Sequence, residues 1–269
     1  MKYSKMLKEL FSDISLSVED LLLLESFQIK YLPERVPQKE FAALIRKYPF
    51  VKSFLIAKNP SVEIFINSVL KANKEIDDES LIEEYCEELL WEIADLIVYN
   101  RFPEKYDEKT KFTWNIDEII EKESLEGKIV ADVGAGSGML AFLLAKYATT
   151  VYAVEPISSF RTFIRQKAST GNYSNVYVVD GFLESIPFPE NTFDILFTSN
   201  AIGWNIEKEL QEIERVVKPT GQAIHIIRVN ENVTENPVHE KLISGEWNYK
   251  FNETTDENGT KLKYIKTIV

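Results

Sequence analysis

The sequence predicts an α/β fold, a mostly parallel sheet with helices on both faces, preceded by an all-helical N-terminal domain. Two observations predict it. After about residue 115, short apolar runs alternate with helical patterns, which is typical of βαβ units and a parallel sheet. Before that point the chain has no alternating run and little glycine. We therefore expect two domains, residues 1–114 and residues 115–269.

The N-terminal domain is expected to consist of helices set off by capping residues and prolines. Ser17 with Asp20 reads as the start of a helix through LLLLESFQIKYL, and Pro37 precedes another in QKEFAALIRKY. Pro49 and Pro60 divide the next stretch into short segments. Asp78 is expected to cap a long helix over about 79–99, because apolar residues recur there at three- and four-residue steps.

The segment IVADVGAGSGML, residues 129–140, runs an apolar strand directly into glycines at positions 134, 136 and 138. Glycines directly after a buried strand let the backbone turn sharply and approach a ligand closely. The following MLAFLLAKYA predicts a helix whose N-terminus faces the same point. Strand, turn and helix together predict a nucleotide-type binding unit.

Spacing separates the three protein classes that use such a turn. A phosphate-binding P-loop needs GxxxxGK[ST], and no Lys-Ser or Lys-Thr pair follows these glycines. The dinucleotide fingerprint GxGxxG needs glycine at position 139, where the chain has Met139. A nicotinamide-dependent oxidoreductase therefore stays only a minor alternative. With these two patterns set aside, the segment is best described as a GxGxG turn preceded by the acidic residue Asp132.

Polar residues recur where the next strands end. TTVYAVEP predicts a strand ending at Glu155, whose carboxylate can accept hydrogen bonds from ribose hydroxyls. NVYVVDG predicts another, ending at Asp180, and a strand over Phe193–Thr198 carries small polar residues at its tip. The C-terminal stretch, in which Trp247 opens an alternating run, predicts a β-hairpin.

These motifs resemble those of the class I S-adenosylmethionine (SAM)-dependent methyltransferases. The GxGxG turn with Asp132 resembles their motif I, and SIPFPENTFDILFTSNAIGW is similar to the "LPFPD-x-SFD-xV" segment of the ubiquinone/menaquinone-biosynthesis type. ELQEIERVVKPTGQAIHIIRV is similar to that family's helix, "K-PGG" turn and fifth strand. The resemblance covers about 115–269 and implies a Rossmann-like, seven-stranded sheet with one antiparallel strand. SAM would be the cofactor and S-adenosylhomocysteine its product.

The resemblance also implies which residues bind SAM. Asp132 would hold the amino group, Glu155 the ribose, and Asp180 the adenine amino group. The full expected set is Asp132, Gly134, Ala135, Gly136, Gly138, Glu155, Pro156, Asp180, Gly181, Phe182, Asn200 and Ala201. Gly138 is expected to serve packing between helix and strand more than ligand contact.

Three aromatic residues are substrate-contact candidates. Trp204 falls where the family commonly has a His-Trp pair, but Gly203 replaces the histidine and removes one polar group near the transferred methyl. In the segment 100–114, expected to drape over the methionine end as a lid, Tyr106 and Trp114 are the candidates. The alternative is that aromatic residues in this segment join the two domains, and that Trp204 packs under the sheet edge.

Composition restricts the remaining classes. Net charge is −12, with 31 basic and 43 acidic residues, which disfavours nucleic-acid substrates. The single cysteine, Cys86, excludes an internal disulfide and a cysteine-based zinc site and is expected to be a buried structural thiol. No metal is expected. No membrane-spanning run or signal peptide is recognisable, so we expect a cytoplasmic protein, with homodimerisation left open.

The sequence thus predicts a SAM-dependent methyltransferase acting on a small molecule, with the acceptor unidentified. The alternative is a methyltransferase-like protein that binds SAM without catalysis and serves as sensor or scaffold. Methyl transfer from a sulfonium needs mainly positioning. His225 and His239 are expected to have ordinary structural roles, with His239 on a surface helix, and no catalytic base is assigned.

Overall fold

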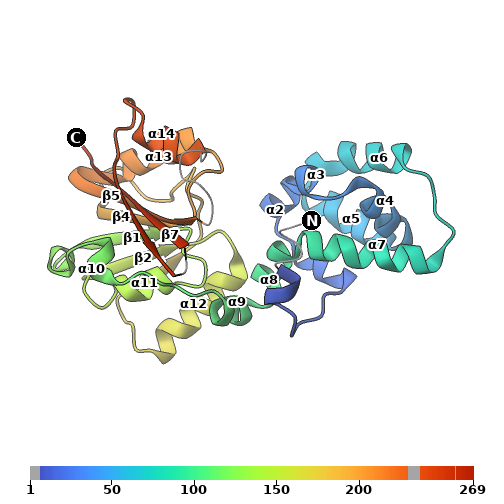
Figure 1. Cartoon of the computed structure of the whole chain (residues 1–269), viewed down its shortest axis with the longest axis horizontal. Helices are drawn as coiled ribbons and strands as arrows, with labels where there is room; N and C mark the ends of the chain where they lie inside the picture. Colours follow the sequence, from blue (N-terminus) through green and yellow to red (C-terminus); the bar gives the residue numbers. More distant parts are fainter. Residues whose placement is uncertain (1–6, 230–236, 258) are drawn as a thin grey trace. The chain divides into compact units, whose positions relative to one another are not determined.

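The computed structural model describes residues 7–229, 237–257 and 259–269. The chain divides into two compact units, residues 1–110 and 111–269. Each is treated by itself below (Figure 1). In the part of the chain that the structure describes, no helix is both long enough and apolar enough to span a membrane.

In the first unit the only regular elements among residues 7–110 are helices, and prolines begin several of them. Pro49 and Pro60 each occupy the first position of a helical segment, where the missing N–H costs nothing. The elements are η1 (Val18–Leu23), α2 (Ser26–Lys30), α3 (Leu32–Arg35), α4 (Gln38–Lys47), α5 (Pro49–Lys58), η2 (Pro60–Val62), α6 (Glu63–Ala72), α7 (Glu79–Glu92), α8 (Ala94–Arg101) and α9 (Pro103–Lys109). The all-helical N-terminal region is confirmed.

Two helices of this unit differ from the expectation. The long helix over 79–99 is interrupted at Ile93, whose φ of −114° and ψ of 23° separate α7 from α8. Its start is as predicted, because the Asp78 carboxylate accepts from the Ser80 and Leu81 N–H groups. The helix expected from Ser17 is a short 3-10 turn instead. There Asp20 is buried against Arg101, so a tertiary ion pair replaces continued helix.

The second unit is built on a seven-stranded sheet of order β3-β2-β1-β4-β5-β7-β6. The strands are β1 (Ile129–Val133), β2 (Thr150–Val154), β3 (Val176–Val179), β4 (Phe193–Ser199), β5 (Val217–Val229), β6 (Lys250–Asp256) and β7 (Gly259–Thr267). Strands β1 to β5 are parallel, and β7 runs antiparallel to both β5 and β6. The predicted sheet and its C-terminal hairpin are confirmed.

Helices cover both faces of this sheet (Figure 1). One apolar cluster joins the sheet to α13 (Ile206–Val216) and α14 (Pro237–Ile243), and another joins the opposite face to α10 (Ile116–Ile119), α11 (Met139–Leu144) and α12 (Ser158–Thr170). A 3-10 turn, η3 (Lys122–Leu125), precedes β1. Because α11 directly follows β1, the glycine turn lies at the carboxyl end of the sheet.

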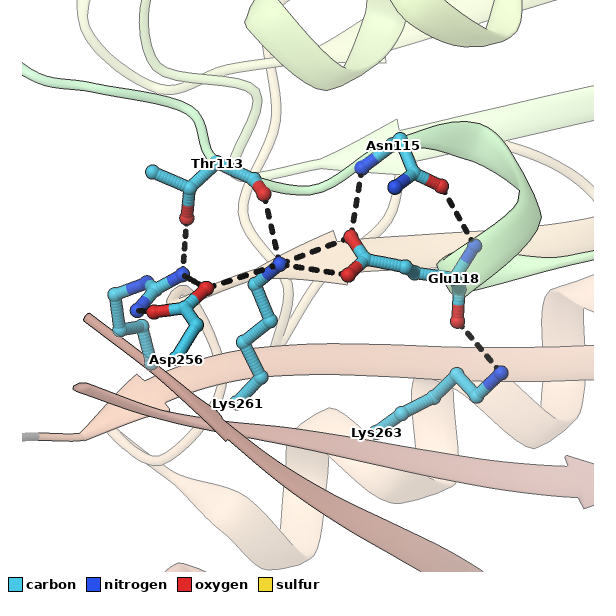
Figure 2. Close-up of polar contacts among 7 residues, drawn as sticks. Thr113, Asn115, Glu118, Asp256, Lys261 and Lys263 are labelled. Atoms are coloured by element: carbon cyan, nitrogen blue, oxygen red, sulfur yellow. Dashed lines mark hydrogen bonds and ion pairs between the residues drawn. The ribbon is translucent and has the colours of Figure 1, made fainter. Parts of the chain in front are cut away.

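A buried lysine fixes the segment before β1, residues 111–119, which we call the strap (Figure 2). The Lys261 ammonium on β7 donates to the Thr113 carbonyl at 2.8 Å and to both Glu118 carboxylate oxygens at 2.8 and 2.9 Å. It also lies 3.3 Å from Asp256. Partial burial acts to raise the pKa of Glu118, but the hydrogen bonds from Lys261 and the Asn115 N–H together hold it below its usual value. The strap is thereby tied to the C-terminal hairpin.

Replacing this lysine is expected to destabilise the second unit. Lys261→Met leaves the partly exposed carboxylates of Glu118 and Asp256 without their shared cation. We therefore expect the free energy of unfolding to fall by about 2 kcal/mol. Lys263→Met is the matched control, because among the described residues Lys263 donates to the Glu118 carbonyl alone, at 2.7 Å. Urea unfolding measures both variants. If the free energy of unfolding fell equally in the two variants, the central role of Lys261 would be contradicted.

Candidate functional site

The glycine turn after β1 has a left-handed backbone at each of its three glycines. Gly134, Gly136 and Gly138 have φ values of 76°, 54° and 84°. A Cβ on Gly134 would overlap the Cβ of Ala201, so the turn and the end of β4 touch there. Nothing lies within 4 Å of the corresponding position on Gly136, whose missing side chain faces open space. A ligand can therefore approach the backbone at Gly136, whereas Ala201 blocks the approach at Gly134.

Gly138 serves packing, but between two helices and not between helix and strand as expected. A Cβ there would lie 3.0 Å from Phe142 and 3.1 Å from Ile164, so α11 and α12 approach each other at this residue. Ala135, between the first two glycines, donates its N–H to the Val154 carbonyl. The turn is thus anchored to the end of β2.

Asp132, on β1, is the most unusual polar group of the second unit. It is 1% exposed, and among the described residues neither carboxylate oxygen accepts a hydrogen bond of full geometry, although the Ala141 N–H is near enough to affect it. Burial, helped by the nearby Glu155 carboxylate, raises its pKa from 3.8 to about 7, and the Ala141 N–H counters this only in part. A buried carboxylate left in this state is suited to pair with a cation that enters the site.

The raised pKa of Asp132 predicts how the stability of the folded protein changes with pH. The folded protein holds the Asp132 proton more tightly than the unfolded chain, so stability falls as pH rises from about 4 to about 7 and is level above. Asp132→Asn removes this cost. We expect its stability advantage over the unsubstituted protein to grow by about 2–3 kcal/mol between pH 5 and pH 8, at 1.36 kcal/mol per pKa unit. Urea unfolding at both pH values measures it, and a pH-independent difference would contradict it.

Glu155 follows β2 and links the glycine turn to the start of α12. The residue is 4% exposed. One of its carboxylate oxygens accepts the Gly136 N–H at 2.7 Å and the other accepts the Ile157 N–H at 2.9 Å. The Glu155 carboxylate thus holds the glycine turn and the start of α12 together at the end of β2.

Arg161, on α12, joins the ends of β2 and β3 and was not singled out from the sequence. One guanidinium nitrogen donates to the carbonyls of Glu155 and Pro156, at 2.9 and 2.6 Å, and lies 3.1 Å from the Asp180 carboxylate. The Asp180 side chain is 67% exposed. Arg161 therefore sets the position of an accessible carboxylate at the end of β3.

The two residues after Asp180 form a tight corner. A Cβ on Gly181 would lie 2.6 Å from Pro187 and 2.9 Å from Val154, so only glycine fits. Phe182 is 38% exposed and bridges to Ser185. An aromatic face thus lies next to Asp180.

Asn200 ends β4 in a left-handed conformation, with φ 52°. Its side-chain oxygen accepts the Arg228 N–H at 2.8 Å. The Arg228 guanidinium contacts the Thr113 hydroxyl and lies 3.0 Å from the Asp256 carboxylate. Figure 2 labels Thr113 and Asp256. The end of β4 is therefore connected to the strap through the end of β5.

The loop after Ala201 is organised by Glu209, a second residue that sequence reasoning missed. Its carboxylate is buried and accepts the N–H groups of Gly203, Trp204 and Asn205 at 2.7, 3.0 and 2.9 Å. This fixes the backbone while Trp204 is 65% exposed, so Trp204 is not packed under the sheet edge. An acidic residue three positions after the first residue of α13 was the only sequence signal.

The other two aromatic candidates lie in different units. Tyr106, on α9, packs edge-on against Tyr99 at 5.1 Å within the helical unit. Trp114, in the strap, is 8% exposed, and the Lys261 ammonium lies 5.2 Å from its ring centre. Their proposed contact with substrate stays a prediction.

The remaining candidate residues are structural. His225 is fully buried with its Nδ1 2.8 Å from the Thr198 hydroxyl, and burial lowers its pKa to about 3. The prediction of a surface position for His239 was wrong: it is 7% exposed and lies 2.8 Å from the Tyr264 hydroxyl, because α14 packs on the sheet. Cys86 is buried and free, as expected.

Comparison with known proteins identifies the class of domain. Residues 131–225 match the methyltransferase domain family. The uncharacterized methyltransferase YcgJ of Bacillus subtilis (strain 168) is 27% identical over 117 residues, 43% of this chain and 45% of that protein. The ubiquinone/menaquinone biosynthesis C-methyltransferase UbiE of Blochmanniella pennsylvanica (strain BPEN) is 31% identical over 117 residues, 41% of this chain and 46% of that protein.

The chain therefore spans about half the length of these curated relatives. Among solved structures, a SAM-dependent methyltransferase from Aquifex aeolicus is similar with a TM-score of 0.46 and 22% identity, over 72% of this chain and 100% of that chain. The predicted resemblance to class I methyltransferases is confirmed by the family match.

Proposed function

We propose that the chain, whose residues 131–225 match the methyltransferase domain family, binds SAM at the glycine turn and transfers its methyl group to a small molecule. The observation that carries the proposal is the buried, unpartnered Asp132 carboxylate beside the open face of Gly136. Ligands of doubly wound sheets bind at the carboxyl ends of the strands, which is where both residues lie.

The other polar groups fit the remaining parts of SAM. Asp132 would pair with the amino group, Glu155 would accept from the ribose hydroxyls, and the accessible Asp180 would accept from the adenine amino group. Arg161 would hold Asp180 in place. Phe182 offers an aromatic face to the adenine ring. These assignments follow the family resemblance and agree with the burial and exposure of each residue.

Methyl transfer needs little chemistry from the protein. Bound SAM supplies an activated methyl on a sulfonium; an acceptor lone pair attacks that carbon while the carbon–sulfur pair leaves with sulfur. The chain's part is to position both reactants in line. Asn200 and Ala201 would form the floor beside the methyl, and Trp204 on its Glu209-fixed loop would contact the acceptor. His225 is unsuited to be a base because it is fully buried.

The Asp132 carboxyl predicts how SAM affinity depends on pH. Binding of the SAM ammonium favours ionised Asp132, whereas the free protein keeps the proton below about pH 7. We expect affinity to rise by up to about tenfold per pH unit between pH 5 and 7 and then level off. Calorimetry across this range measures it. Asp132→Asn should abolish the rise and Asp180→Asn should keep it; a rise that persists in Asp132→Asn would contradict the assignment.

Turnover is tested by following S-adenosylhomocysteine formation from methyl-labelled SAM in the presence of small amines, phenols, thiols and quinols. We expect label to enter at least one of these acceptors with the unsubstituted protein and none with Gly134→Ala. SAM binding without label transfer to any acceptor would favour the alternative, a protein that binds SAM without catalysis.

A further inference from the structure

A cavity of about 540 Å³ lies in the second unit between the strap, α11 and α12. Its size falls within the range of about 300–1,000 Å³ that is typical of small-molecule sites. It extends from Met139, the first residue of α11, to Thr170 and Gly171 at the end of α12. That end of α12 is the one remote from Glu155, and none of the described lining residues belongs to the expected SAM-binding set.

Aromatic rings form much of the cavity wall. Trp114, Phe142 and Tyr173 line it, and the rings of Phe142 and Tyr173 are 4.9 Å apart. Trp114 and Phe142 are each 8% exposed, so they belong to the core and are held by it. The Lys261 network fixes the strap that carries Trp114 (Figure 2). The wall is therefore preformed and apolar.

The charge of the cavity is opposite to that of the chain. Lys146 and Lys167 line it, and no acidic residue is among the described residues that do. The Lys167 ammonium lies 5.2 Å from the centre of the Phe142 ring, which places a positive charge directly over the aromatic wall. In a protein of net charge −12, two lysines beside an apolar cavity are suited to an apolar anion.

We propose that this cavity is a second binding site, which takes a small aryl-alkyl carboxylate. The aryl group lies against Trp114, Phe142 and Tyr173, and the carboxylate accepts from Lys146 and Lys167. Neither lysine belongs to the proposed SAM site, so this inference stands or falls independently of the proposed function.

The test compares three probes with one apolar body: 4-phenylbutyrate, 4-phenylbutanol and 4-phenylbutylamine. Calorimetry is done on the full chain without SAM and again with saturating S-adenosylhomocysteine. We expect the carboxylate to bind about tenfold more tightly than the alcohol, because its hydrogen bonds are charge-assisted, and the amine to bind most weakly. S-adenosylhomocysteine should leave the carboxylate affinity unchanged.

Substitutions at the cavity test whether the probe binds there. Lys146→Met with Lys167→Met should remove the tenfold preference for the carboxylate while keeping the alcohol affinity. Thr170→Glu adds a negative charge at the exposed rim and should weaken only the carboxylate; Lys208→Met, on α13, is the matched control and should change neither. Absence of 4-phenylbutyrate binding, an unchanged preference in the lysine double variant, or competition by S-adenosylhomocysteine would each overturn the proposal.

Discussion

Gly134→Ala is expected to abolish SAM binding. The new Cβ would overlap the Ala201 Cβ, and the residue would have to keep a φ of 76°. The left-handed backbone costs about 1–2 kcal/mol and the overlap about 1–3 kcal/mol more. The turn is therefore expected to shift away from β4, with both lower stability and a SAM affinity reduced by about 100-fold or more. Calorimetry and urea unfolding measure the two effects.

Two further glycines separate these effects. Gly136→Ala puts a Cβ into open space at a φ of 54°, so it should cost only about 1–2 kcal/mol for the left-handed backbone while weakening SAM binding, because the ligand would pass there. Gly127→Ala, at φ 76° but before β1 and also without a close neighbour, should cost stability alone. If all three variants bound SAM equally well, the site would not be at this turn.

Glu209→Gln is expected to release the loop that carries Trp204. One carboxylate oxygen accepts the Trp204 and Asn205 N–H groups and the other accepts the Gly203 N–H. In glutamine one of these oxygens becomes an NH₂ donor, which then faces a backbone donor. Because hydrogen bonds to a buried charge contribute about 1.5–3 kcal/mol, we expect a stability loss of about 2–3 kcal/mol.

Hydrogen exchange reports on this loop directly. The amides of residues 203–205 should exchange much faster in Glu209→Gln, with the β1–β4 amides still protected. Glu207→Gln is the control on the same helix, since Glu207 pairs only with Lys241 among the ion pairs described. Unchanged protection at 203–205 would show that another contact fixes the loop.

Local patterns were sufficient for the sheet and the polar ends of its strands. The apolar run before Gly134 reflects burial on both faces of the sheet, which is a property of nearby residues. The alternation that begins at Trp247 indicated the hairpin, although the buried Trp247 and Tyr249 precede β6, whose residues are all exposed. Local patterns also place Glu155 and Asp180 directly after β2 and β3, since a strand end is a local feature.

Contacts between distant residues could not be predicted in this way. Arg161 and Glu209 act through backbone groups of other segments, and Lys261 is buried although the sequence KLKYIKTIV presents it as one of three equivalent strand lysines. The interruption at Ile93 could not be predicted either, because the apolar pattern continues through it: Leu89 before it and Ile97 after it pack into the same cluster. His239 looked exposed because nothing local shows that α14 packs on β7.

Calorimetric titration of the full chain with SAM, S-adenosylhomocysteine and NAD tests the central claim most directly. The account predicts that SAM and S-adenosylhomocysteine bind, that Gly136→Ala weakens both, and that NAD does not bind. Binding of NAD with no binding of SAM would contradict it.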